Sequence, residues 1–251
     1  MRGFVGVAAA VNTQTGEPVV LAESDPSALD AEAPLLPLSI AKLWLAASWW
    51  DRAGGREPVS VHEMLVGGSD DDARELARAL RKAAGTAPVV GDLRRFGATT
   101  TLTEATPENA WDDALSIGEA NLETNLLRVS DFLRGVGGGT PMIRPDTARK
   151  LQSAMLDAVT RGTGREIANA LSGTGWRIGG KTGTGPGSVG PQSDGWFAGL
   201  VFDGQGRPRY TVAAYVRRGG KGGGRAARVC AEIARTLAAA AERAGGGAKT
   251  P

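Results

Sequence analysis

Ser39 and Lys42 have the residue types and the spacing that nucleophilic catalysis requires. At positions i and i+3 of a helix the two side chains share a face, so the Lys42 amine can reach the Ser39 hydroxyl. A lysine that is partly desolvated in a cleft loses protonation free energy and can accept the serine proton. Ser39 would begin this helix, where unpaired N–H groups favour the oxyanion of an acyl-transfer intermediate. The pair predicts a serine nucleophile with a lysine base, although an N-cap serine beside a solvated lysine has the same spacing.

Ser69, Asp70 and Asp71 form a second candidate group. In the functional interpretation, Ser69 is a proton relay at the edge of a cleft and passes a proton to the leaving group. Ser69 and Asp72 also have the spacing of a capping box, which would open a helix over residues 70–82. Acidic residues suit the start of a helix for electrostatic reasons as well. The two interpretations are compatible, because one serine can do both.

A third group, Lys181-Thr182-Gly183-Thr184, falls on a predicted strand. The period of two puts Thr182 and Thr184 on one face, where their hydroxyls can hold a substrate carboxylate, and Gly183 permits close approach. Lys181 then points the other way, and its long stem can carry positive charge beneath the cleft, toward Ser69. The Thr184 amide is the predicted second oxyanion donor beside that of Ser39.

The same region offers an alternative, because the residues from Gly175 to Thr182 match the phosphate-binding pattern G-x-x-x-x-G-K-[ST] of NTPases. That motif works only where a buried strand precedes the loop and a helix begins at the lysine. The segment after Lys181 is rich in glycine and proline and cannot form a helix. No apolar strand precedes Gly175 either, so the sequence disfavours this interpretation.

Composition narrows the classes of function. The chain has 251 residues, with 29 basic and 27 acidic side chains and a formal charge of +2. This balance lacks the excess of positive charge that is typical of proteins that bind nucleic acid. Cys230 is the only cysteine and His62 the only histidine, so we expect no internal disulfide, no metal and no cofactor. The apolar stretches are far shorter than the ~20 residues of a membrane helix.

Periodicity and turn residues predict the elements that must hold these groups. We expect an N-terminal hairpin over about 3–23. Helices should follow over about 39–52, 70–82, 92–96, 125–135, 146–160 and 164–171. Three strands, over about 176–184, 196–202 and 210–217, and a last helix over about 225–244 should complete the domain. This order predicts one α/β domain over 1–251, with an antiparallel sheet formed by the N- and C-terminal segments, flanking helices and an inserted all-helical lobe. The sheet lobe would span about 1–38 and 172–244, the helical lobe about 39–171, and 245–251 would be a flexible tail. The active site should lie in the cleft between the lobes.

In order and spacing, the three groups resemble the S-x-x-K, S-D-N and K-T-G motifs of penicillin-binding proteins and serine β-lactamases. The segments 161–164, 180–185 and 194–199 closely resemble the transpeptidase domain of class B penicillin-binding proteins. The resemblance implies a DD-transpeptidase- or carboxypeptidase-like acyl-enzyme, formed on Ser39 by a D-amino-acid-terminated peptide or a β-lactam. It implies Lys42 as base, Ser69 and Lys181 as proton shuttle, and Thr182 and Thr184 as carboxylate ligands.

Two departures from that pattern bear on activity. Asp71 stands where the second motif has asparagine, and an ionised aspartate cannot donate a hydrogen bond. We expect Asp71 to repel a substrate carbonyl and to hold Lys42 protonated, which would weaken the base. The water-activating glutamate of class A β-lactamases has no counterpart around Glu119 or Glu123, which argues against efficient β-lactamase turnover.

Three outcomes stay open at this point. The chain can be a peptidoglycan enzyme, a relative acting on a small peptide outside the cell wall, or a homologue that binds β-lactam or peptide without turnover. We expect a cytoplasmic location if the sequence is complete and an extracytoplasmic one if it is an excised domain. The sequence does not indicate an oligomeric state.

Overall fold

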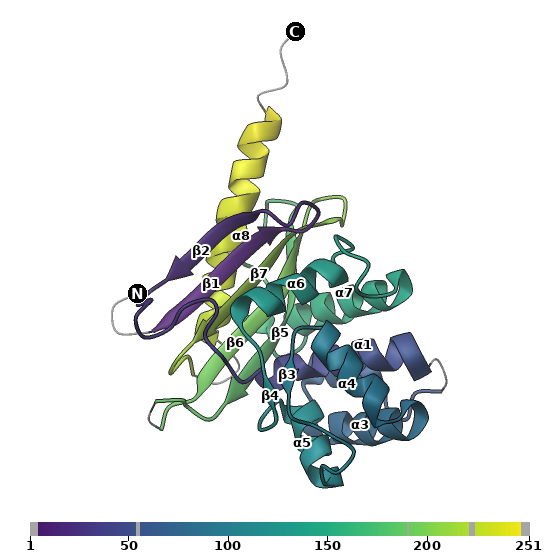
Figure 1. Cartoon of the computed structure of the whole chain (residues 1–251). Helices are drawn as coiled ribbons and strands as arrows, with labels where there is room; N and C mark the ends of the chain where they lie inside the picture. Colours follow the sequence, from purple (N-terminus) through teal and green to yellow (C-terminus); the bar gives the residue numbers. More distant parts are fainter. Residues whose placement is uncertain (1–4, 54–55, 190, 221–223, 247–251) are drawn as a thin grey trace.

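A five-stranded antiparallel sheet and a lobe of helices form the molecule (Figure 1), seen in a computed structural model that describes residues 5–53, 56–189, 191–220 and 224–246. The strands lie in the order β2-β1-β7-β6-β5, so the two ends of the sequence build one sheet. Their bounds are β1 Gly6–Asn12, β2 Pro18–Glu23, β5 Arg177–Gly185, β6 Asp194–Phe202 and β7 Pro208–Val216. The predicted fold class is confirmed.

The helices between β2 and β5 make up the other lobe. They are α1 Ala41–Ser48, α2 Val61–Gly67, α3 Asp70–Ala84, α4 Thr86–Arg95, α5 Glu108–Ile117, α6 Leu126–Val136 and α7 Pro145–Thr160. Shorter pieces join them: the 3-10 turns η1 Leu38–Ile40 and η3 Arg165–Ile167, the π-helical turn η2 Trp49–Ala53, and a small ribbon of β3 Thr99–Thr100 with β4 Leu122–Glu123. The last helix, α8 Gly224–Gly246, packs on the sheet.

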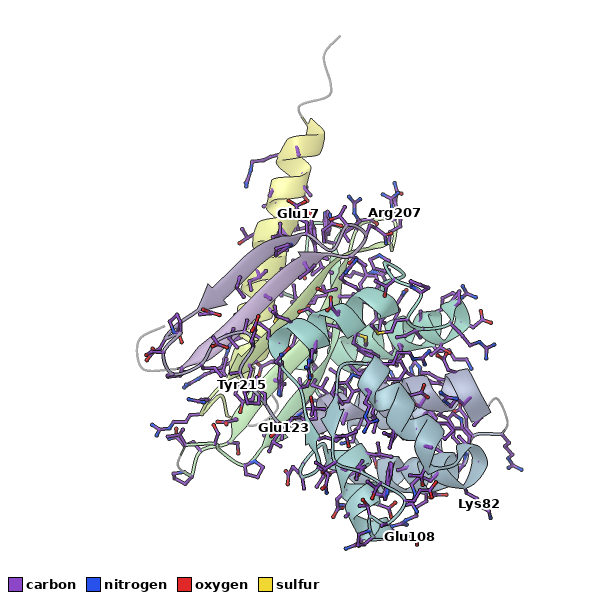
Figure 2. All side chains as sticks on the ribbon, viewed as in Figure 1. Glu17, Lys82, Glu108, Glu123, Arg207 and Tyr215 are labelled. Carbon is purple, nitrogen blue, oxygen red and sulfur yellow. The ribbon has the colours of Figure 1, made fainter. Side chains whose placement is uncertain are left out.

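The strand β6, between β7 and the edge strand β5, is buried along its whole length because the sheet is covered on both faces. Trp196 belongs to the apolar core shared with the helical lobe, whereas Phe197 packs in the core shared with α8. Tyr215 of β7 lies edge-on to Trp196, with ring centroids 5.1 Å apart, and donates a hydrogen bond to Asp194. Charged residues such as Lys82 and Glu108 lie at the rim of the helical lobe (Figure 2). The sheet is thus a packed support for its edge strand β5.

Helix α1 lies at the centre of the helical lobe, and all eight of its residues are buried. A helix that is apolar on every side belongs in a core. Trp44 on this helix packs edge-on against Phe132 of α6 at 6.4 Å, and Trp49 and Trp50 are buried just beyond it, so this tryptophan cluster packs in the core. Lys42 is the single charged residue of α1, and burial of a charge is costly unless the charge is paired.

Several predicted elements differ from those observed. The predicted helix 39–52 begins as a 3-10 turn and ends in a π-helical turn, and the predicted helix 164–171 is only the short turn η3. Helix α4 begins at Thr86 rather than near Asp92, because Pro88 falls in its first turn, where its missing N–H costs nothing. Helices α2 and α5 were not predicted. Helix α8 continues to Gly246, and residues 247–251 of the predicted tail lie outside the described residues.

The phosphate-binding alternative does not survive the structure. Strand β5 runs unbroken from Arg177 to Gly185, through the lysine at which a helix would have to begin. It pairs with β6 along this whole length, from Arg177 opposite Phe202 to Gly185 opposite Asp194. The backbone amides here serve a sheet and not a phosphate loop.

Candidate active site

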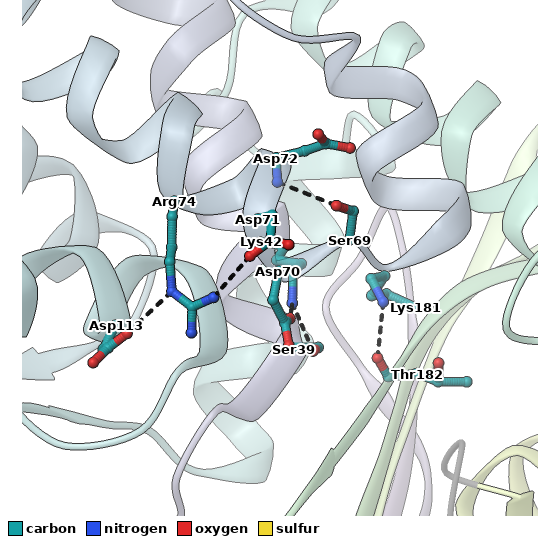
Figure 3. Close-up of polar contacts among 10 residues, drawn as sticks. All are labelled: Ser39, Lys42, Ser69, Asp70, Asp71, Asp72, Arg74, Asp113, Lys181 and Thr182. Carbon is teal, nitrogen blue, oxygen red and sulfur yellow. Dashed lines mark hydrogen bonds and ion pairs between the residues drawn. The ribbon is translucent and has the colours of Figure 1, made fainter.

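The structure brings the first predicted pair together at the junction of the lobes (Figure 3). The Lys42 Nζ donates a hydrogen bond of 2.9 Å to the Ser39 Oγ. Ser39 lies in the 3-10 turn η1 and is partly exposed, whereas the Lys42 side chain is fully buried. A buried amine beside a reachable hydroxyl has the geometry that activation of a serine requires.

A tight turn in front of Ser39 fixes the nucleophile. Leu38 has φ of 53°, a left-handed conformation that costs a non-glycine residue about 1 kcal/mol or more. Its N–H donates to the Gly118 carbonyl at the end of α5, at 3.1 Å. A Cβ on Gly118 would overlap the Leu38 carbonyl, and a Cβ on Gly185 would overlap the Leu38 side chain. Ser39 is therefore wedged between the end of α5 and the strand β5.

The aspartate that contacts Lys42 is Asp70 and not Asp71. The Asp70 Oδ1 lies 2.5 Å from the Lys42 Nζ. The Asp71 side chain is 98% exposed and pairs with Arg74 at 3.2 Å. The predicted contact between Asp71 and Lys42 is therefore wrong. The reason is geometric, since successive residues of a helix point about 100° apart and, of these two aspartates, only Asp70 points toward Lys42.

The protonation of Lys42 also differs from the prediction. The hydrogen bond and the charge of Asp70 do favour the protonated amine, but burial outweighs them and lowers the pKa of Lys42 below its usual range. The positive charge of Arg74 acts in the same direction as burial. Lys42 is thus a better base than a neighbouring aspartate alone would allow.

Ser69 caps helix α3. Its Oγ accepts a hydrogen bond of 3.1 Å from the Asp72 N–H, as the capping interpretation predicts. Among the described residues, which include both site lysines, its hydroxyl makes no hydrogen bond to Lys42 or Lys181. The predicted relay contact is therefore not formed. Gly68 lies beside Lys181, since a Cβ added there would lie 3.5 Å from the lysine Nζ.

Lys181 is buried on β5, and its Nζ donates to the Thr182 carbonyl at 3.1 Å. Burial and, to a smaller extent, repulsion from Lys42 lower the pKa of this lysine to about 7, against the opposing effect of Asp70. Near neutral pH Lys181 therefore exists in both protonation states. This property suits a group that exchanges protons during a reaction.

The two threonines lie on the opposite face of β5 from Lys181. Thr182 pairs across the sheet with Phe197, which packs toward α8. Its hydroxyl donates to the Thr163 hydroxyl at 2.8 Å, in the loop after α7. Gly183 faces the nucleophile: a Cβ there would lie 3.5 Å from the Ser39 N. The carboxylate-binding role of Thr182 and Thr184 stays a prediction.

Ion pairs from three arginines hold α3 against α5, and the sequence analysis missed them. They join Arg74 to Asp113 at 3.2 Å, Arg78 to Asp112 at 2.6 Å and Arg81 to Glu108 at 3.3 Å. Arginines four and three residues apart share one helix face, which is the signal that was available. Since α5 also ends at Gly118, one helix positions both Ser39 and Asp70.

No metal site accompanies these residues in the described part of the chain, where no group of three or more His, Cys, Asp or Glu side chains is placed to hold an ion. His62 instead pairs with Asp157 at 2.9 Å. A cavity of about 660 Å³ lies elsewhere, where the end of α7 meets the start of β5, and Trp176 and Arg177 line it. None of the helices described combines the length and apolar character needed to cross a bilayer.

Comparison with known proteins agrees with this geometry. Residues 139–237 match the family model of the penicillin binding protein transpeptidase domain. No curated protein sequence matches the chain.

Solved structures extend the likeness to nearly the whole fold. The transpeptidase domain of FtsI4 D,D-transpeptidase from Legionella pneumophila is 21% identical, with a TM-score of 0.73, over 93% of this chain and 88% of that one. The transpeptidase domain of penicillin-binding protein 3 from Burkholderia pseudomallei is 19% identical, with a TM-score of 0.70, over 94% and 88%. PBPA from Mycobacterium tuberculosis is 17% identical, with a TM-score of 0.73, over 94% and 74%. At these identities the likeness is one of fold.

Residues 139–237 thus match the penicillin binding protein transpeptidase family, and the fold of nearly the whole chain resembles that of solved transpeptidase domains.

Proposed function

We propose that this chain is a serine acyltransferase or hydrolase that forms an acyl-enzyme on Ser39 with a D-amino-acid-terminated peptide or a related amide. One observation carries the proposal: the fully buried Lys42 amine donates 2.9 Å to the Ser39 hydroxyl. The lowered pKa of Lys42 supports the role of base, because a neutral amine is the form that can take the serine proton.

Acylation uses groups already in contact. The Ser39 Oγ attacks the substrate carbonyl while its proton passes to neutral Lys42, and the amides of Ser39 and Thr184 are the proposed donors to the oxyanion. The C–N bond then breaks, and the leaving amine takes a proton from Lys42. Lys181 is the proposed source of positive charge next to Ser39, and the strand β5 offers Thr182 and Thr184 for the terminal carboxylate of the substrate.

A second candidate is a homologue that is acylated once and does not turn over. One support for this alternative is that the Ser69 hydroxyl makes no hydrogen bond to Lys42 or Lys181, the groups of the relay that would help the leaving group and the acyl acceptor. Gly68, which lies beside the Lys181 amine, carries no hydroxyl. Efficient β-lactamase turnover has less support, since the sequence offers no counterpart of the class A glutamate.

Intact-protein mass spectrometry tests the proposal. The chain is incubated with a fluorescent penicillin and with an acyl-D-alanyl thioester, beside the Ser39→Ala variant. We expect the wild type to gain the mass of one acyl group and the variant to gain none. An adduct that persists without product release favours the binder. A wild type that gains no mass with either reagent would refute the acyl-enzyme.

A further inference from the structure

Asp70 joins the buried part of the site to solvent. One carboxylate oxygen lies 2.5 Å from the Lys42 Nζ, yet the side chain is 52% exposed while that of Lys42 is fully buried. The two acidic residues that follow it do not share this position: Asp71 pairs outward with Arg74, and Asp72 supplies its N–H to the Ser69 cap. Asp70 is thus the carboxylate that both solvent and the base can reach (Figure 3).

The local structure holds Asp70 in place. It is the first residue of α3, directly after the Ser69 cap, and the N-terminal end of a helix favours negative charge. One turn further on, Arg74 ties α3 to Asp113 of α5 at 3.2 Å. The α5 end also fixes the turn before Ser39 through the bond from the Leu38 N–H to Gly118. A catalytic carboxylate needs this kind of support from packed elements.

The other polar groups of the site make hydrogen bonds within the fold. Ser69 caps its helix, and the Lys181 amine donates to the Thr182 carbonyl from a buried position. Lys42 lies behind Asp70 as seen from solvent, since its side chain is buried and that of Asp70 is half exposed. A molecule that enters the site to attack an acyl-Ser39 therefore meets the Asp70 carboxylate before it meets either lysine.

We propose that Asp70 is a catalytic residue that activates the acyl acceptor, which is water or a primary amine, and passes its proton to Lys42. The step rests on the acyl-enzyme proposed above. The acceptor attacks the acyl carbon and forms the new bond, while its proton goes to the free oxygen of Asp70. Rotation of the Asp70 carboxyl group then turns the protonated oxygen toward neutral Lys42, which takes the proton. Lys42 delivers it to the Ser39 Oγ as the C–Oγ bond breaks, so that serine, amine and carboxylate all return to their starting states.

The chain offers a matched pair of variants for the test. Asp70→Asn and Asp71→Asn remove the same charge from the same helix turn, but only the first replaces the carboxylate that contacts Lys42. The acyl-D-alanyl thioester is the probe, and mass spectrometry follows both the formation and the decay of the Ser39 adduct. General-base catalysis contributes about 10²–10⁴-fold, so we expect the Asp70→Asn adduct to decay at least ~100-fold more slowly while Asp71→Asn behaves as wild type.

A pH series separates catalysis from a merely structural role. Wild-type decay should depend on pH, whereas Asp70→Asn should lose this dependence and Asp70→Glu should restore it in part. Circular dichroism checks that the variants fold. Adducts that decay equally fast in wild type and Asp70→Asn overturn the role of Asp70 and leave the acyl-enzyme intact. A wild-type adduct that never decays also overturns it, and a wild type that is never acylated overturns both proposals.

Discussion

Two buried lysines face each other across the junction of the lobes, Lys42 on α1 and Lys181 on β5. Burial lowers the pKa of both. Lys42 has a hydroxyl and a carboxylate as partners, at 2.9 Å and 2.5 Å, whereas Lys181 donates only to a backbone carbonyl. A charged partner offsets part of the desolvation that a buried amine suffers, and a carbonyl offsets less.

This difference between the partners of the two lysines indicates where in the site protons can be transferred. Lys42 is connected to the nucleophile on one side and, through Asp70, to solvent on the other. Lys181 has no such connection among the described residues, because the Ser69 hydroxyl makes no hydrogen bond to it and the neighbouring Gly68 has no side chain. The helical lobe therefore holds the reacting groups, and the sheet lobe contributes charge and backbone.

The largest expected effect comes from removing the connected amine. Lys42→Met replaces the base by an apolar chain of similar length, and we expect acylation of Ser39 to slow by about 10²–10⁴-fold. Lys181→Met should slow it less, by roughly 10-fold, because this amine does not touch Ser39. The initial rate of adduct formation measures both. Equal losses in the two variants would show that the asymmetry between the lysines has no functional meaning.

The burial of Lys181 should also make stability depend on pH. The folded-state pKa of Lys181, about 7, lies below its usual value of 10.5, so the unfolded chain binds more protons between these values. Stability then rises with pH across this window, and the penalty for burying the charge is largest below pH 7. Lys181→Met removes the penalty, which is on the order of a few kcal/mol.

Urea unfolding of both proteins at pH 7 and pH 9.5 measures this effect. The variant should be more stable than wild type at pH 7, and the gap should narrow at pH 9.5. A gap that widens toward high pH would contradict the assignment of Lys181 as a desolvated amine.

The sequence correctly predicts the contact between Lys42 and Ser39, but it predicts the wrong aspartate as the partner of Lys42. The spacing of Ser39 and Lys42 decides their contact because both lie within one helical turn. The choice between Asp70 and Asp71 depends on a single residue of offset at the start of α3, where neighbouring side chains point about 100° apart. The motif alone does not determine that phase, which is set by the Ser69 cap and by the ion pairs to α5.

The fold also has features that the sequence predicts and features that it does not. The order of strands and helices follows from local periodicity, and the strand segments around β5, β6 and β7 lie close to their predicted ranges. The turn before Ser39 depends on Gly118, which lies eighty positions away in the sequence. The lack of a side chain at Gly118 matters only because the Leu38 carbonyl lies against it. Such a contact has no local signature, so the sequence cannot indicate it.

Gly118 offers a test of how the nucleophile is held. Gly118→Ala places a Cβ against the Leu38 carbonyl at φ of 68°, and we expect a loss of about 2–4 kcal/mol in stability together with slower acylation. Gly138→Ala is the control, since Gly138 has φ of 78° and open space around it. It should cost about 1 kcal/mol and leave acylation unchanged. Equal losses in the two variants would mean that backbone strain, and not the contact with Leu38, explains the effect.

The smallest expected effect would give Lys181 the partner that it lacks. Gly68→Ser puts a hydroxyl next to the lysine Nζ, because the added Cβ would lie 3.5 Å from that atom. Gly173→Ser is the control for strain, since its φ of 82° resembles the 74° of Gly68 and nothing lies near it. We expect both variants to lose about 1 kcal/mol in stability. Only Gly68→Ser should change the acylation rate, by a few-fold upward, as the hydroxyl links Lys181 to the leaving group. An unchanged rate would show that Lys181 acts through its charge alone.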